Sequence, residues 1–362
     1  MTRRLRVAFV TPATFDDIRG GGERYVLNLA RGVARASGGT AEVELVAPGR
    51  GSSRRQIDDG VWLRICRAEP SDPSQGSALS WELIEAAVAA DLVHVHQVFT
   101  LLGEAAVLAA RVRRRPVCVT DHGGWSSTTG RRLGLLDLAD AVVAYSRCGA
   151  AALGTSRSVE VIEGGVDTRF FCPGSAERSG RHVLFVGRIL PHKGVDLLVR
   201  ACPAGVSLVI AGTVADPEYL REVERLAGGR AVSFVLDASD ERLRELYRDA
   251  LAVVAPSVHV DLAGRFYAYP ELMGLTMLEG MACGAPAVCL RTGALPEYVE
   301  HGVTGFVADD EAELGRRIAE LAGDPARGLR MGNAARERVR RDWDLEVTGR
   351  RFLDLYRRLV AG

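Results

Sequence analysis

The sequence predicts an α/β protein built from two doubly wound parallel-sheet domains. Short apolar, β-branched runs alternate with helical patterns along all 362 residues. Continuous apolar strands separated by helices are typical of parallel sheets that are covered on both faces. One such series occupies each half of the chain, and the length suits two domains with a core each. We therefore expect two Rossmann-like domains, and two sheets facing each other across a cleft would bring the loops after their strands together.

The individual elements follow from these runs. Strand-like runs lie at 5–11, 43–47, 62–66, 92–96, 117–120, 141–145 and 159–162 in the first half, and at 182–186, 207–211, 232–235, 252–255, 287–289 and 305–307 in the second. Helical patterns fill most gaps, as at 22–36 and 241–249. The segment 344–360 has apolar residues at helical spacing and predicts a terminal helix. A stretch rich in Pro, Gly and Ser, 170–181, is the predicted linker.

Composition excludes several classes of protein. The formal net charge is zero, so no global field favours nucleic acid or an anionic membrane. No apolar run approaches the roughly 20 residues that span a bilayer. The short apolar run after the basic N-terminus indicates a buried strand rather than a signal peptide. The seven cysteines never form Cys-x-x-Cys. They are interpreted as reduced, buried thiols of a cytoplasmic protein.

Lys193 is the only lysine among 46 basic side chains, and Arg188 lies five residues before it. A lysine is a compact point charge and an arginine a planar fork, a combination that suits a diphosphate. Both residues follow the first strand of the second half, and ligands of open α/β sheets bind beyond the carboxyl ends of strands. The alternative is a solvated lysine at the start of a helix.

Glu271 and Glu279 flank the start of a helix expected from about Gly274 to Cys283. The first amides of this helix, near Gly274, Leu275 and Thr276, lack intrahelical partners and offer an anion site supported by the helix dipole. Glu279, one turn inside, can accept hydrogen bonds from a ribose diol. Taken alone, the pattern fits a surface helix with two solvated glutamates equally well.

Weaker signals come from the glycines at 20–22, which precede a helix, and from His122 after the fifth strand. No G-x-G-x-x-G or P-loop pattern accompanies them. His94 and His96 share one face of a strand and are interpreted as packing, since no third metal ligand lies nearby.

Two charged patterns also receive structural interpretations. Asp342-Trp-Asp344 resembles a metal motif, but it lies between helices and is interpreted as helix capping, so no metal ligand is assigned. The arginines at 111–115 are interpreted as compensation of a helix dipole rather than as contacts with anionic lipid.

These motifs together resemble the retaining GT-B nucleotide-sugar glycosyltransferases of the family-4 type, a bacterial-rich group that includes sucrose- and trehalose-type synthases. The resemblance runs from Val7 to about Tyr356 and is more specific in the second half. The motifs that carry it are Gly-Gly-x-Glu23, Asp91–His96, Ile162–Asp167, Val-Gly-Arg188, Lys193-Gly194, Pro256-Ser257 and Glu271-x₇-Glu279 followed by Gly280–Pro286. Gly164 replaces the usual Asn, and the segment 258–270, with Phe266, Tyr267 and Tyr269, is longer than usual.

The resemblance implies a domain division and a set of roles. An acceptor-binding N-terminal domain would span 1–172, a donor-binding C-terminal domain 178–342, and the helix at 344–362 would return to the first domain. Roles fall on ten residues: Arg188 and Lys193 on the donor diphosphate, Glu271 on the transferred sugar, Glu279 on the ribose, Gly274, Leu275 and Thr276 on phosphate or sugar, Gly21 and Gly22 closing on the donor, and His122 at the reacting centre. No metal or other cofactor is expected.

The expected activity is transfer of a sugar from a nucleoside-diphosphate sugar to an acceptor hydroxyl by front-face substitution, with positive groups stabilising the leaving diphosphate. Uridine is preferred over guanosine on family frequency. Two other functions remain open: a catalytically silent paralogue that binds sugar nucleotide, and a GT-B phosphorylase or epimerase. For the acceptor, a natural-product aglycone, a cell-envelope lipid and a small polyol remain open, as does the oligomeric state. Peripheral membrane contact is not favoured.

Overall fold

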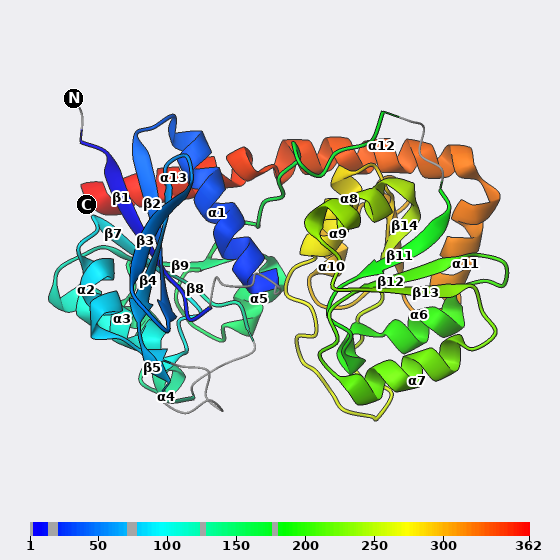
Figure 1. The fold of residues 1–362 in the computed structure, drawn as a ribbon, viewed down its shortest axis with the longest axis horizontal. Coiled ribbons are helices and arrows are strands. Elements are labelled where there is room, and N and C mark those ends of the chain that lie inside the picture. Colours follow the sequence, from blue (N-terminus) through cyan, green and yellow to red (C-terminus); the bar gives the residue numbers. More distant parts are fainter. Residues whose placement is uncertain (1–2, 14–20, 71–77, 124–127, 176–179) are drawn as a thin grey trace. The chain divides into compact units, whose positions relative to one another are not determined.

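The computed structural model describes residues 3–13, 21–70, 78–123, 128–175 and 180–362. They form two compact units, Met1–Gly165 with Leu345–Gly362, and Val166–Asp344 (Figure 1). Each unit has its own sheet and its own buried core. None of the helices in the described part of the chain is long and apolar enough to cross a membrane.

The sheet of the first unit has the strand order β10-β9-β8-β7-β1-β2-β4-β3. Its neighbouring strands are parallel except for the β3–β4 pair. The strands are β1 (Leu5–Val10), β2 (Ala41–Gly49), β3 (Ser53–Asp58), β4 (Val61–Arg67), β7 (Leu92–His96), β8 (Val117–Thr120), β9 (Ala141–Ala144) and β10 (Glu160–Val161), with a small separate pair β5 (Glu69–Pro70) and β6 (Ala78–Leu79). The helices are α1 (Gly21–Ser37), α2 (Trp81–Val88), α3 (Leu101–Val112), α4 (Thr128–Arg132), α5 (Arg147–Ala152) and α13 (Leu345–Ala361), with the 3-10 turn η2 (Leu135–Leu138).

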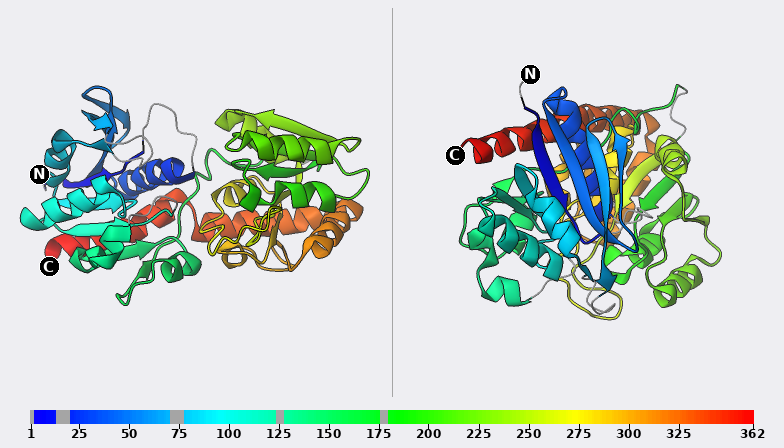
Figure 2. Two further views of the ribbon diagram at one scale, coloured as in Figure 1. Left: turned by 90° about the horizontal axis from the view of Figure 1, so that it is seen from below. Right: turned by 60° about the vertical axis from the view of Figure 1, so that its left-hand side comes forward.

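Alternation along the strands of the first unit separates two faces. Val93 and Val95 of β7 pack with α2 and α3 in one apolar cluster. His94 and His96 therefore point to the other face, where α13 contacts β7 and α1 packs along α13. Figures 1 and 2 show the red α13 beside the blue α1.

Glycines allow α1 and α13 to approach closely. A Cβ at Gly32 would lie 2.3 Å from the carbonyl oxygen of Leu345, and a Cβ at Gly349 would lie 2.1 Å from the backbone of Gly32. Real Cβ atoms would force the two backbones apart, so this contact requires glycine on both helices. The predicted return of the terminal helix to the N-terminal domain is confirmed.

The second unit has a parallel sheet with the strand order β13-β12-β11-β14-β15-β16. Its strands are β11 (His182–Val186), β12 (Leu208–Gly212), β13 (Val232–Leu236), β14 (Ala250–Ala255), β15 (Ala287–Leu290) and β16 (Gly305–Ala308). Its helices are α6 (Val195–Ala201), α7 (Pro217–Ala227), α8 (Asp240–Asp249), α9 (Leu275–Ala282), α10 (Leu295–Tyr298), α11 (Glu311–Gly323) and α12 (Pro325–Asp342), with the 3-10 turn η3 (Pro191–Lys193). Side chains from α6, α7 and α11 form the core of one face, while α8 and α9 contact β14 from the other.

The predicted fold class, two Rossmann-like parallel-sheet domains, is confirmed, and the structure adds two details. The units divide after Gly165, whereas the family resemblance implies a first boundary at 172. The segment between these positions belongs to the second unit because the ring of Phe171 packs on Tyr247 and Arg248 donates to the Cys172 carbonyl. The antiparallel strand β3 was missed because all its residues except Ile57 are polar and most are exposed, so no apolar run marks it.

Candidate functional site

The strand order of the second unit reverses between β11 and β14. From β11 the sheet continues through β12 and β13 on one side, and from β14 through β15 and β16 on the other. In doubly wound sheets, ligands bind outside the carboxyl ends of the strands at this switch point. The loop after β11 carries Arg188 and Lys193, and the loop after β14 carries Ser257 and Glu271. The predicted donor residues therefore lie on the two loops that border the switch point.

Lys193 and Glu271 are in direct contact. Nζ of Lys193 donates to Oε2 of Glu271 at 2.7 Å, and the hydroxyl of Ser257 donates to the same oxygen at 3.4 Å. The lysine and glutamate side chains are only 16% and 21% exposed. An ion pair shielded in this way interacts more strongly than one in open water. The structure thus joins two predicted site residues that lie 78 positions apart in the sequence.

A glycine permits this contact. Gly194 follows Lys193 with φ 65°, in the left-handed region that favours glycine. A Cβ at Gly194 would lie only 2.1 Å from the carbonyl oxygen of Pro256. The backbones of the two loops therefore touch at a point where no other residue fits, which places Lys193 beside the segment that leads to Glu271.

Positive charge gathers at the loop after β11. Arg188 is exposed and makes no hydrogen bond or ion pair with any part of the chain that the structure describes. Burial, followed by the charges of Lys193 and Arg188, lowers the pKa of His192 to about 4. His192 is consequently neutral at physiological pH, and the two cations remain the charged groups of this loop.

Helix α9 begins where it was expected. Its N-cap residue, Gly274, provides no side-chain hydrogen bond to the amides of the first turn. Those amides include Leu275 and Thr276, of which Leu275 is buried and Thr276 partly exposed. The first turn therefore has the uncapped form that can accept an anionic group.

Glu279 lies inside α9 and is 1% exposed. The hydroxyl of Tyr247 on α8 donates to its Oε2 at 3.0 Å. Because Glu279 is buried and Glu271 is paired with Lys193, the alternative of a surface helix with two solvated glutamates is wrong. Tyr247 carried no signal in the sequence, since its partner lies on another helix.

The long segment 258–270 forms a hairpin in which Val260 pairs with Phe266. Asp261 is buried at its centre and accepts hydrogen bonds from Ala263, Arg265 and Tyr267. The ring of Tyr267 lies 4.9 Å from that of His192, so the hairpin rests against the loop after β11. Phe266 and Tyr269 remain exposed.

Among the predicted site residues of the first unit, His122 has the most contacts with other side chains in the structure. It follows β8, its Nε2 lies 3.1 Å from Nδ1 of His96, and its ring stacks on those of His96 and Tyr145. Burial lowers its pKa to about 3, so the ring is neutral. Gly21 and Gly22 open α1, and a Cβ at either would meet nothing within 4 Å. Gly20 lies outside the described residues.

The two histidines of β7, His94 and His96, have different partners. His94 is a packing residue as expected, since its two ring nitrogens bond to Tyr356 at 2.7 Å and Thr120 at 2.8 Å. For His96 the packing interpretation is incomplete, because this residue bonds to the predicted site residue His122. The sequence shows the shared face of His94 and His96 but not the neighbouring strand that brings His122 there.

Asp342, Asp344 and Arg111, from the remaining charged patterns, each bond to another side chain of the protein. Asp344 accepts a hydrogen bond from Thr168, and Asp342 pairs with Arg341 at 2.8 Å. Arg111 at the end of α3 pairs with Asp140 at 2.9 Å. Within the ranges described, no group of three or more His, Cys, Asp or Glu side chains is arranged to hold a metal ion.

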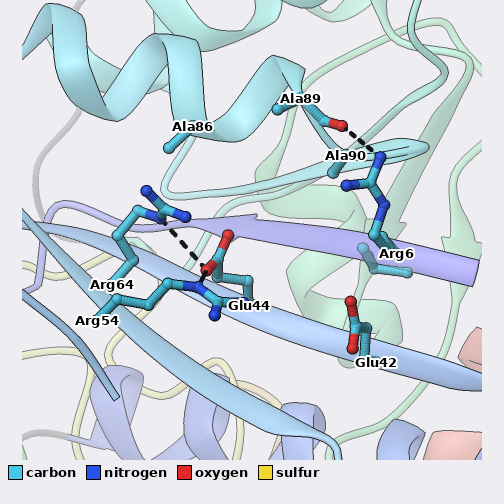
Figure 3. A pocket seen from close by; sticks show the side chains of 9 residues that line it. Arg6, Glu42, Glu44, Arg54, Arg64, Ala86, Ala89 and Ala90 are labelled. Carbon is cyan, nitrogen blue, oxygen red and sulfur yellow. Dashed lines mark hydrogen bonds and ion pairs between the residues drawn. The ribbon is translucent and has the colours of Figure 1, made fainter. Parts of the chain in front are cut away.

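A pocket of about 180 Å³ lies elsewhere in the first unit, among β1, β2, β3, β4 and α2 (Figure 3). Its charges largely pair with one another, because Glu44 contacts Arg54 at 2.5 Å and Arg64 at 3.3 Å. It includes none of the predicted site residues, and we assign it no function.

Family models and curated relatives match most of the chain. The model described as glycosyl transferases group 1 matches residues 174–338, and the model described as glycosyltransferase family 4 matches residues 19–170. An alpha-maltose-1-phosphate synthase of Mycobacterium tuberculosis is 32% identical over 348 residues, which cover 80% of this chain and 87% of the relative. A GDP-mannose-dependent alpha-(1-6)-phosphatidylinositol monomannoside mannosyltransferase of Mycolicibacterium smegmatis is 30% identical over 281 residues, which cover 68% of this chain and 72% of the relative.

Among solved structures, HepE of Anabaena in complex with UDP and glucose has a TM-score of 0.75. The match covers 98% of this chain and 100% of that chain at 20% sequence identity. At this level of identity the likeness shows a common fold, and that fold is GT-B.

Proposed function

Because the chain belongs to the group 1 glycosyltransferases, we propose that it transfers a sugar from a nucleoside-diphosphate sugar to an acceptor hydroxyl with retention of configuration. The observation that carries the donor assignment is the contact of Lys193 with Glu271 at the switch point of the second unit. A cation and a hydrogen-bonding carboxylate next to each other suit a diphosphate and the sugar attached to it.

Each donor residue takes a separate part of the ligand. Arg188 and Lys193 bind the diphosphate, with the amides of Leu275 and Thr276 as further donors. Glu271 accepts hydrogen bonds from hydroxyls of the transferred sugar, and Glu279 from the ribose. Lys193 then exchanges its carboxylate partner for phosphate, while Glu271 retains the hydroxyl of Ser257 and gains the sugar. Gly21 and Gly22 leave room for the donor to approach α1.

The reaction replaces one bond at the anomeric carbon. The acceptor oxygen attacks on the face from which the diphosphate departs, and the proton of the acceptor hydroxyl passes to an oxygen of the leaving phosphate. Negative charge develops on the diphosphate while positive charge develops on the sugar. Arg188, Lys193 and the amides of the α9 N-terminus stabilise the first of these charges. No carboxylate is required as a nucleophile, because Glu279 is assigned to the ribose.

Two finer features of the donor belong to the same proposal. We assign uridine as the base, a preference that HepE, crystallised with UDP, supports and that the GDP-mannose-dependent relative opposes. We also propose that no metal ion is needed, since the cations and amides above supply the positive charge. A thermal-shift comparison of UDP- and GDP-sugars tests the base, and unchanged turnover with EDTA tests the metal.

The decisive experiment measures release of nucleoside diphosphate by the parent enzyme and by Lys193→Ala. Loss of one preorganised positive donor lowers kcat by about 10²–10³-fold. Arg225→Ala is the matched control, because Arg225 is an exposed cation of the same unit that pairs with Glu222. If Lys193→Ala stays within a few-fold of the parent, Lys193 does not stabilise the leaving group.

The same assay separates the alternatives. A transferase releases nucleoside diphosphate faster when an acceptor is added, whereas an epimerase changes the sugar without releasing it. A phosphorylase requires inorganic phosphate as the attacking group. A silent paralogue shows donor binding in the thermal-shift screen with no product for any acceptor. We further propose a cytoplasmic location, which the buried thiols of Cys66, Cys118, Cys202, Cys283 and Cys289, none of them in a disulfide, support.

A further inference from the structure

A buried group of aromatic and imidazole rings lies at the carboxyl end of β7 and β8 in the first unit. His96 ends β7 and is fully buried. Its Nδ1 lies 3.1 Å from Nε2 of His122, and the two rings are stacked at 5.3 Å with 14° between their planes. The sequence pattern explains His96 as packing, and the reaction proposed above does not use it.

Three other rings pack against the ring of His122. His96 stacks on it at 5.3 Å and Tyr145 at 5.6 Å, each within 14° of parallel, and Tyr25 approaches its edge at 4.9 Å. Nε2 is hydrogen-bonded to His96, whereas Nδ1 makes no hydrogen bond to any residue that the structure describes, and the residue as a whole is partly exposed. Nδ1 is therefore the atom that His122 can offer to a ligand.

A hydrogen bond between Nδ1 of His96 and Nε2 of His122, which lie 3.1 Å apart, requires one proton between them. Burial lowers the pKa of both rings, to about 3 for His122, so each is neutral and carries a single N–H. In the first arrangement His96 donates, and His122 carries its own proton on Nδ1. In the second, His122 donates, and His96 carries its proton on Nε2.

The environment of His96 favours the first arrangement. Its Nε2 is buried and has no hydrogen-bond partner among the residues that the structure describes. The second arrangement would leave an N–H donor there without an acceptor. Unpaired buried N–H groups are rarer in proteins than unpaired acceptor lone pairs, and each costs the desolvation of a donor. An unpaired lone pair on Nε2 of His96 therefore costs less free energy than an unpaired N–H donor at the same position.

We propose that His96 is a positioning residue that fixes His122 with its proton on Nδ1, so that His122 presents a neutral hydrogen-bond donor to an oxygen of the donor sugar or its diphosphate. Only the identity of that ligand rests on the proposed function; the tautomer does not. His122 is then a fixed N–H dipole, of the kind that stabilises developing charge without proton transfer, and not a general base.

The tautomer is measured directly by NMR on the full-length protein with ¹⁵N-labelled histidine, using long-range ¹H–¹⁵N correlations near pH 7. We expect a protonated Nδ1 and an unprotonated Nε2 for His122, with His122→Gln providing the assignment. A protonated Nε2, or a doubly protonated ring, overturns the proposal. This measurement needs no turnover, so an enzyme inactive on every donor would refute the proposed function and leave the tautomer result standing.

Substitutions of His96 test the consequence for catalysis. The amide nitrogen of His96→Asn can occupy the place of Nδ1 and still donate to His122, whereas His96→Phe keeps a buried ring and loses the donor. We expect His96→Phe to lower kcat by about tenfold, the change that loss of one hydrogen bond produces, and to mix the tautomers of His122. His96→Asn should restore most of the rate and the Nδ1–H signal.

His94→Phe is the matched control, because His94 is an equally buried imidazole on the same strand that bonds to Tyr356 and Thr120 and not to His122. Equal losses of kcat in His96→Phe and His94→Phe, with the His122 spectrum unchanged in both, would show that His96 contributes packing alone. If a phenylalanine variant does not fold, the spectrum of the parent and the His96→Asn rates still decide the question.

Discussion

The buried bond between Tyr247 and Glu279 makes a quantitative prediction about the second unit. Tyr247→Phe removes one hydroxyl and keeps the ring, which packs edge-on against Phe171 at 5.8 Å between centroids. The lost hydrogen bond is 3.0 Å long and ends on a carboxylate that is 1% exposed. Water cannot readily replace the hydroxyl at such a position, so the carboxylate loses a donor.

Hydrogen bonds to charged groups contribute about 1.5–3 kcal/mol, and we expect Tyr247→Phe to lower the unfolding free energy by this amount. If Glu279 holds the ribose, the affinity for nucleoside diphosphate falls as well, because the carboxylate is less firmly oriented. Urea denaturation followed by circular dichroism measures the first effect, and calorimetric titration with UDP the second. Hydrogen exchange should show the loss concentrated in α8 and α9.

Tyr267→Phe is the matched control, since Tyr267 also donates to a carboxylate at 3.0 Å, that of Asp261. Asp261 keeps three other donors, the amides of Ala263 and Arg265 and the guanidinium of Arg265. The expected loss is therefore below about 1 kcal/mol. Our reasoning on the buried bond is refuted if the two variants unfold with free energies within about 0.5 kcal/mol of each other.

Three further outcomes are expected. Gly349→Ala places a Cβ 2.1 Å from the backbone of Gly32 and should destabilise the first unit by roughly 1–3 kcal/mol; an unchanged melting temperature would contradict the close helix contact. Burial raises the pKa of Asp121 from 3.8 to about 6 despite the neighbouring Arg131, so its contribution to stability is present below about pH 4 and lost as the pH rises through 6. Asp121→Asn should remove this pH-dependent loss of stability. We would reject the prediction if the unfolding free energies of Asp121→Asn and the parent differed by the same amount at pH 4 and at about pH 7. Phe266→Ser, at a side chain 71% exposed, should change stability by less than about 0.5 kcal/mol in thermal melting.

Much of the fold and part of the site could be predicted from local patterns. Apolar β-branched runs and the helices between them indicated both sheets, because strand burial leaves a continuous trace in the sequence. Lys193, Glu271 and Glu279 stood out because each follows a strand or opens a helix, where ligands of α/β proteins bind. The polar edge strand β3 left no such trace and was missed.

The sequence by itself determined the two-domain α/β class and the helix that returns to the first unit, and it indicated the candidate donor residues near the start of α9. Tertiary structure alone decided which of these side chains meet: Lys193 with Glu271, Tyr247 with Glu279, and His96 with His122. The physical reason is that these contacts join loops, strands and helices through strand order and close glycine packing. Local periodicity reports which face of an element is buried, and carries no information about the partner that buries it.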